Sequence, residues 1–178
     1  MRPFLTAVLA LCALPVFAAG PIAKELDEEL ANIEHDIVPL VEAMPAAQFN
    51  FAPTQGEFKG VRTFALQARH VAATIYEVSA AVLGEKAPVA MGTGENGPDA
   101  LKSKEEIVKY LKDSFVYAHK AMNSLTDKNF MDPIGTPFGS GKAPRLKLAS
   151  MAVWHSFDHY GQMVVYLRMN GIVPPASR

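Results

Sequence analysis

The sequence predicts an all-α protein built as a four-helix bundle. Three observations lead to this prediction: four long segments place apolar residues at alternating spacings of three and four, strand-like alternation is scarce, and no internal repeat is present. The chain has 178 residues, of which 49% are hydrophobic and 20% charged, and these values are typical of one globular domain. Long loops between the second and third helices and between the third and fourth leave room for crossover connections.

Residues 1–18 have the pattern of a secretory signal peptide. A basic start at Arg2 precedes a nearly continuous apolar run, and small residues stand at the cleavage offsets that end in Ala18. The apolar run is too short to span a bilayer comfortably, which disfavours a membrane anchor. We therefore expect cleavage after Ala18 and export to the periplasm or the extracellular space. The mature domain, residues 19–178, should then have no contact with the membrane.

Composition excludes several functions. Seventeen basic and eighteen acidic residues give a formal net charge of −1, so the chain has no basic surface for nucleic acid. The single cysteine, Cys12, lies in the predicted signal peptide. The mature domain therefore has neither a disulfide nor a thiolate, and a metal site in it must be built from histidine and carboxylate side chains.

The first two helices are predicted over residues 23–47 and 59–83. Pro39 lacks an amide hydrogen and should kink the first helix. The second helix carries an apolar stripe beside a polar one, and Gly84 ends it. The polar stripe either borders a cavity or faces solvent. Its members are Thr63, Gln67, His70, Thr74 and Glu77.

The third and fourth helices begin at recognisable start signals. Ser103 and Glu106 form a capping box, in which each side chain accepts a hydrogen bond from an otherwise unpaired backbone amide. Pro144 is a favourable first-turn residue for the fourth helix, which should run to about Asn170 with Gly171 as a left-handed cap.

Histidines supply the candidate site. His155 and His159 lie one helical turn apart, so one face of the fourth helix can point both imidazoles at one metal ion. His70 lies at a similar depth in the second helix and would add a third ring if the two helices have level ends. Three histidines with an open fourth position are typical of a catalytic rather than a structural metal site. His35 should be exposed, and His119 is either a surface residue or a fourth ligand.

A peptidase is an alternative interpretation of the same segment. The pattern from His155 to His159 is similar to the inverted metalloprotease motif His-x-x-Glu-His, with Asp158 in place of the glutamate. Aspartate is one methylene shorter, and a helical bundle offers no sheet edge for an extended substrate. Both observations disfavour the peptidase. Asp158 is then either a surface carboxylate or a group that supports a ligand from behind.

Other chemistries lack their motifs. No histidine has a glutamate three residues before it, which excludes the di-iron bundle pattern, and the haem and dinucleotide motifs are absent. Residues 135–142 superficially resemble a phosphate loop. The spacing is one residue too long, alanine stands where serine or threonine is needed, and no strand precedes the segment, so we exclude this interpretation as well.

Several short segments together resemble one known family. They are Phe51–Pro53, Val61–Phe64 with His70 downstream, Leu83–Lys86, Ser124–Asp127, His155–Gly161 and Tyr166–Pro175. Across the whole mature chain they resemble the DinB-like family of the YfiT type, and the last segment is similar to secreted members.

The resemblance implies a four-helix bundle in which His70, His155 and His159 bind a divalent metal ion. Some members of that family are thiol-dependent transferases or isomerases, and the family often forms dimers, so a homodimer is an expectation here. Export would separate this chain from cytosolic thiols, which argues against a thiol-transferase role without affecting the metal.

Three hypotheses follow for the mature domain. The first is a metal-dependent enzyme, a transferase or hydrolase acting on a small molecule not identified by the sequence, with Zn²⁺, Ni²⁺, Fe²⁺ or Mn²⁺ activating a water or a thiol. The second is an exported metal-binding or stress protein without catalysis. The third is a bundle whose histidine rings do not converge. The sequence leaves open whether His119, Gln67, Thr74 or Glu77 contributes to the site.

Overall fold

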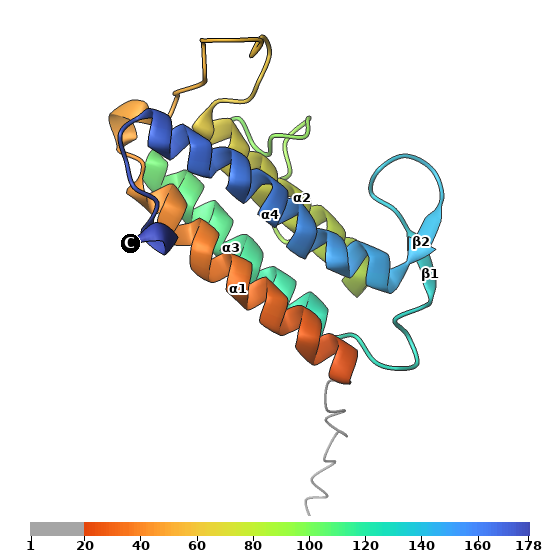
Figure 1. The fold of residues 1–178 in the computed structure, drawn as a ribbon. Coiled ribbons are helices and arrows are strands. Elements are labelled where there is room, and N and C mark those ends of the chain that lie inside the picture. The colour runs from red at the N-terminus through yellow and green to blue at the C-terminus, as the bar shows by residue number, and fades with distance from the viewer. Residues whose placement is uncertain (1–19) are drawn as a thin grey trace, which may run out of the picture.

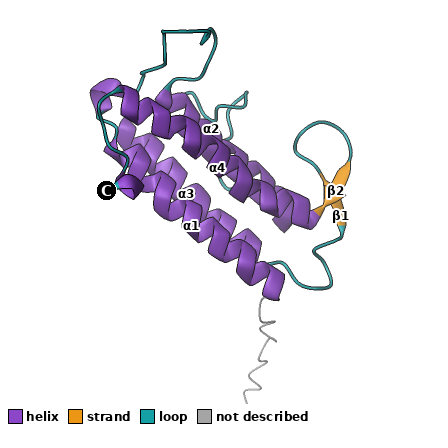
Figure 2. Cartoon of the chain, in the orientation of Figure 1, coloured by secondary structure: helices purple, strands orange, loops and turns teal. Residues whose placement is uncertain are grey.

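A computed structural model describes residues 20–178, and the predicted signal peptide lies outside them. Four long helices make up most of this part of the chain, as predicted (Figures 1 and 2). They are α1 (Pro21–Ala43), α2 (Phe64–Leu83), α3 (Lys104–Asn123) and α4 (Arg145–Met169). Two short 3₁₀ helices, η1 (Ala46–Gln48) and η2 (Pro175–Ser177), follow α1 and α4. No helix of residues 20–178 combines the length and the apolar character needed to cross a membrane.

The order of the helices around the bundle is α1, α3, α2, α4. Helix α2 packs against α3 and α4, α1 also packs against α3 and α4, and the remaining pairs lie diagonally across the core. The segments joining α1 to α2 and α3 to α4 are therefore the crossovers. The long loop between α2 and α3 joins neighbouring helices, so its length is not needed to cross the bundle.

Two helix boundaries differ from the prediction by at least four residues, each for a local reason. Helix α1 ends at Ala43 rather than residue 47, because Met44 precedes a proline and is extended, with ψ at 122°. Helix α2 begins at Phe64 rather than residue 59, because Gly60 takes a left-handed φ of 82° and Thr63 caps the first turn through its side chain. Helix α1 continues through Pro39 without a break.

Three of the predicted helix signals are present, whereas Pro144 is not in the first turn of α4 but precedes it as the N-cap. Ser103 and Glu106 form both hydrogen bonds of the capping box of α3. Gly84 caps α2 with φ at 70°, and Gly171 follows α4 with φ at 73°, a conformation that a side chain disfavours.

A short hairpin departs from the all-helical expectation. Strands β1 (Pro133–Gly135) and β2 (Lys142–Pro144) pair antiparallel, with Ile134 opposite Ala143. The segment that superficially resembled a phosphate loop is the tip of this hairpin, which stands beside the start of α4 (Figure 2).

The core lies between the four helices. The apolar stripes predicted from the sequence face one another there, and α2 is the most enclosed helix, because three residues of its polar stripe are buried as well. The largest fully buried aromatic side chains are Phe64, Tyr76 and Phe115. Burial of such a ring contributes roughly 1.5–3 kcal/mol relative to exposure.

Candidate metal centre

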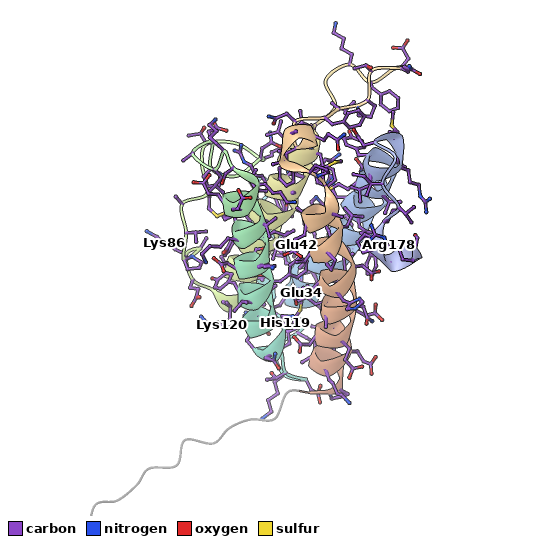
Figure 3. All side chains as sticks on the ribbon, turned by 90° about the vertical axis from the view of Figure 1, so that its left-hand side faces the viewer. Glu34, Glu42, Lys86, His119, Lys120 and Arg178 are labelled. Carbon is purple, nitrogen blue, oxygen red and sulfur yellow. The ribbon has the colours of Figure 1, made fainter. Side chains whose placement is uncertain are left out.

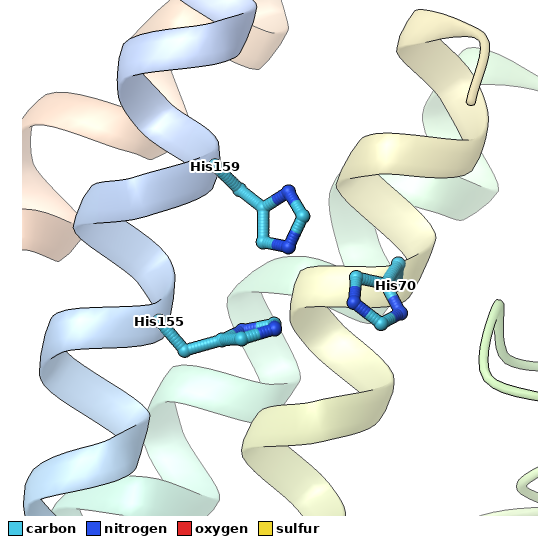
Figure 4. Close-up of side chains that lie close together, drawn as sticks. All are labelled: His70, His155 and His159. Atoms are coloured by element: carbon cyan, nitrogen blue, oxygen red, sulfur yellow. The ribbon is translucent and has the colours of Figure 1, made fainter. Parts of the chain in front are cut away.

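Helices α2 and α4 bring three histidine rings together. His155 and His159 project from the same face of α4, and His70 projects from α2 toward them (Figure 4). The ring centroids lie 5.0 Å apart for His70–His155, 4.8 Å for His70–His159 and 4.5 Å for His155–His159. One ring nitrogen from each residue lies within 4.8 Å of the other two, so the group could hold a metal ion. The hypothesis in which the rings do not converge is wrong.

Hydrogen bonds fix the tautomer of two of these rings. Nδ1 of His70 donates to the backbone oxygen of Glu95 at 2.7 Å, and Nδ1 of His159 donates to Oε1 of Gln67 at 2.5 Å. Both acceptors are oxygens without a hydrogen, so each Nδ1 carries the proton and each Nε2 keeps its lone pair. This arrangement is typical of histidines that bind metals, in which the second nitrogen donates to a carbonyl or carboxylate.

The third ring has an unpartnered polar atom. Nδ1 of His155 is buried and makes no hydrogen bond within residues 20–178. A buried nitrogen without a partner costs free energy unless another group binds it. The surrounding donors are imidazoles alone, a set that suits Zn²⁺, Ni²⁺ or Fe²⁺. The residues present therefore fit a divalent metal ion.

The rings are held neutral, as ligands must be. Burial, followed by the neighbouring histidines, lowers the pKa of His155 to about 4. Burial, followed by His70 and Arg62, lowers the pKa of His159 to about 4. Burial also lowers the pKa of His70, although the hydrogen bond to Glu95 opposes the shift.

Behind His159, a chain of side chains crosses from α2 back to α4. Nε2 of Gln67 donates to Oε1 of Gln162 at 2.9 Å, and Nε2 of Gln162 donates to Oδ2 of Asp158 at 3.1 Å. Asp158 is exposed and stands at the outer end of this chain, two side chains away from His159. Asp158 thus connects to His159 through Gln162 and Gln67, and it does not belong to the group of ligand atoms that the three rings form.

A cavity of about 300 Å³ opens beside the rings. His70, Thr74 and Glu77 line it from α2, and Met151 and His155 line it from α4. Arg62, Glu95 and Phe138 complete its wall from the loops. The polar stripe of α2 therefore borders a cavity, and the alternative of a solvent-facing side is wrong for Gln67, His70 and Thr74, which are all buried.

The remaining histidines lie away from the centre. His35 is exposed on α1, as predicted. His119 is half-buried between α1 and α3, where it contacts Asp27 and Glu34, so it is not a fourth ligand of the three-histidine group.

Sequence reasoning missed the loop residues of the site. Arg62 binds Glu95 at 2.8 Å and Asn96 at 2.7 Å and so holds the loop whose carbonyl orients His70. Arg69 holds the same loop through Gly97 and Asp99. Arg62 lies in one of the segments that carry the family resemblance, but nothing in the sequence connects it to Glu95 across the intervening helix.

These features define a class of protein, a four-helix bundle with a three-histidine centre that could hold a metal ion. The sequence pattern of the DinB superfamily matches residues 29–163. The chain belongs to the DinB superfamily. No functionally curated protein matches the chain.

Among solved structures, the fold is similar to that of a DinB-like protein from Bacillus cereus. The two superpose with a TM-score of 0.65 over 85% of this chain and 95% of that chain, at 17% sequence identity. At this level of identity the likeness concerns the fold.

Proposed function

We propose that the protein is a metal-dependent enzyme of the transferase or hydrolase type that acts on a small molecule. His70, His155 and His159 would hold one divalent ion, Zn²⁺, Ni²⁺, Fe²⁺ or Mn²⁺, through neutral imidazole nitrogens. Such an ion supplies Lewis acidity and lowers the pKa of a coordinated water or thiol. With the predicted signal peptide removed, the enzyme would work in the periplasm or outside the cell.

The observation that supports the proposal is that three neutral histidine rings lie close together beside a cavity. The ligand atoms lie within 4.8 Å of one another, and the cavity reaches His70 and His155. In residues 20–178 no cysteine or carboxylate joins the group. Positions around the ion are therefore open, which distinguishes a catalytic centre from a closed structural one.

The protein's own residues have separable tasks in this proposal. Gln67 and the Glu95 carbonyl orient His159 and His70 by accepting hydrogen bonds from their Nδ1–H groups. The enclosing helices limit the entry of water, which strengthens electrostatic interactions inside the site. The cavity, rather than a bare surface site, also favours catalysis over simple metal storage.

The test has two stages. First, the metal content of protein purified without chelator, and after reconstitution, is measured for the wild type, His155→Ala and the matched control His35→Ala. We expect about one ion per chain in the wild type and the control, and loss of the ion in His155→Ala. Equal, substoichiometric metal in all three proteins would contradict the proposal.

Second, the loaded protein is assayed for ester hydrolysis and for transfer of small thiols to an electrophile. Activity should disappear with chelation and in His155→Ala, and should remain in His35→Ala. Stoichiometric metal without activity in either assay would instead favour a non-enzymatic metal-binding protein.

A further inference from the structure

The cavity beside the three histidines is lined by α2 and α4 and is called the groove below. His70, Thr74 and Glu77 follow one face of α2 at spacings of four and three, while His155 and Met151 follow α4 in the opposite direction. Seven residues of helix correspond to about 10 Å. The groove therefore runs about two helical turns from the rings to Glu77.

Glu77 is a half-buried carboxylate with no partner in the described part of the chain, where neither a hydrogen bond nor an ion pair reaches it. Burial, followed by the nearby charge of Glu95, raises its pKa. Glu77 also lines a second cavity of about 360 Å³, formed with the loop 91–95 and the hairpin tip at Phe138. The carboxylate thus stands where the two cavities adjoin.

Within residues 20–178, Arg62 is the only arginine or lysine that lines the groove, and its side chain is already engaged. The guanidinium of Arg62 donates to Glu95 at 2.8 Å and to Asn96 at 2.7 Å. Its charge is therefore compensated by Glu95, whereas the charge of Glu77 is not compensated by any group in the groove. A partly desolvated carboxylate without a partner is unfavourable, and a bound cation would relieve that cost.

We propose that Glu77 is a specificity-determining residue that binds an ammonium group of the substrate, at the end of the groove opposite the metal. This inference rests on the proposed function. The substrate would be an amine-bearing small molecule whose reacting group faces the three histidines. Met151 and Phe138 supply apolar contacts to the part between the two ends. Glu77 lies about 10 Å along α2 from His70, at the end of the groove away from the three rings.

The experiment uses the Zn²⁺-loaded full-length mature protein and linear hydroxamates as probes, because a hydroxamate chelates zinc and leaves its chain free to extend along the groove. Probes with four, six and eight carbons are compared in three forms, ending in a methyl, an ammonium or a carboxylate group. Affinities are measured by calorimetry for the wild type, Glu77→Gln, Glu77→Lys and the control Glu105→Gln, which changes an exposed carboxylate on α3.

The wild type and Glu105→Gln should bind the ammonium probe of the best-fitting length about tenfold more tightly than the methyl probe. Glu77→Gln should lose this preference while keeping its affinity for the methyl probe, and Glu77→Lys should prefer the carboxylate probe. Retained binding of the methyl probe shows that each variant is folded and loaded.

Equal affinities of the wild type for the ammonium and methyl probes would overturn the inference and leave the proposed function intact. A preference for the carboxylate probe would overturn it in favour of anion binding by Arg62. Failure of the protein to take up any of Zn²⁺, Ni²⁺, Fe²⁺ or Mn²⁺ would defeat the proposed function, and the inference with it.

Discussion

Two seams of the bundle each contain histidine, and they use it in opposite ways. In the seam of α2 and α4, His70 and His159 donate to neutral oxygens, one from the Glu95 backbone and one from the Gln67 side chain. In the seam of α1 and α3, His119 lies between two carboxylates, with Nδ1 2.6 Å from Asp27 and Nε2 3.0 Å from Glu34. Figure 3 shows His119 and Glu34 between these helices.

The difference shows that the hydrogen-bond acceptors, rather than burial, decide whether an imidazole is protonated or keeps a lone pair for a metal ion. Burial by itself would lower the pKa of His119, but its hydrogen bonds to Asp27 and Glu34 outweigh burial and raise the pKa above the ordinary 6.5. Both nitrogens of that ring donate to carboxylates, which leaves no lone pair for a metal. Neutral acceptors in the other seam leave one lone pair on each of His70 and His159.

The largest expected effect is the loss of metal on removal of a ring from the centre. His159→Ala should weaken Zn²⁺ binding by more than about a hundredfold, beyond the effect expected for a group that only supports a ligand. His119→Gln should leave the affinity unchanged. Competition with a chromophoric chelator measures both, and an equal loss in the two variants would remove the distinction between the seams.

The next largest effect is expected from Gln67, which orients the ligand His159 without itself binding the metal. Gln67→Ala removes the acceptor that holds His159 in its tautomer, and Zn²⁺ affinity should fall about 10- to 100-fold. Gln67→Glu restores an acceptor and should recover most of the affinity. Unchanged binding in Gln67→Ala would show that the hydrogen bond has no bearing on the metal.

In the other seam the expected effect is on stability. His119→Ala leaves Asp27 and Glu34 without the donor between them, and the free energy of unfolding should fall by about 1–3 kcal/mol. Urea denaturation of the metal-free protein provides the measurement. A loss of metal affinity in this variant would mean that the two seams are coupled.

The two seams should also respond to pH in opposite directions. His119 has a raised pKa in the folded state, so its stabilisation is complete below pH 6.5 and is lost as pH rises through the folded value. His155 and His159 have pKa values lowered to about 4, so their contribution is complete above pH 6.5 and is lost as pH falls toward 4.

Unfolding of the metal-free wild type and His119→Gln over pH 4–9 tests these signs. The difference in stability between the two proteins should be greatest near pH 6 and should shrink above the raised pKa of His119. A difference that grows with pH would contradict the assignment of His119 as a cation.

The smallest effect concerns an exposed ion pair in the same seam as His119. Lys112 and Glu42 join α3 to α1 at 2.6 Å, but their side chains remain 49% and 44% exposed. Lys112→Ala should change the unfolding free energy by no more than about 0.5 kcal/mol. A larger loss in urea denaturation would indicate that the charges of this seam act as one network.

Much of the fold could be predicted because helical periodicity is local information. The four helices, the capping box at Ser103 and the glycine after Leu83 follow from patterns within a few residues. The errors were local as well. Met44 leaves the helix because of the proline that follows, and Gly60 delays the start of α2. The three-residue strands of the hairpin are too short to produce a pattern.

The site could be predicted only in part. The spacing of His155 and His159 on one helix face, and the similar depth of His70, indicated the three rings. His119 was ambiguous in the sequence, because Asp27 and Glu34 lie far from it along the chain. Arg62 and Glu95 were missed for the same reason, since the loop returns to α2 only in the folded protein.

The sequence by itself determined where the helices form, which face of each is apolar and which histidines share a face, because backbone propensity and side-chain period act within one or two turns. Only the tertiary structure decided which acceptor faces each imidazole. Those contacts join residues distant in the chain, and they make the rings between α2 and α4 neutral and the ring between α1 and α3 a cation.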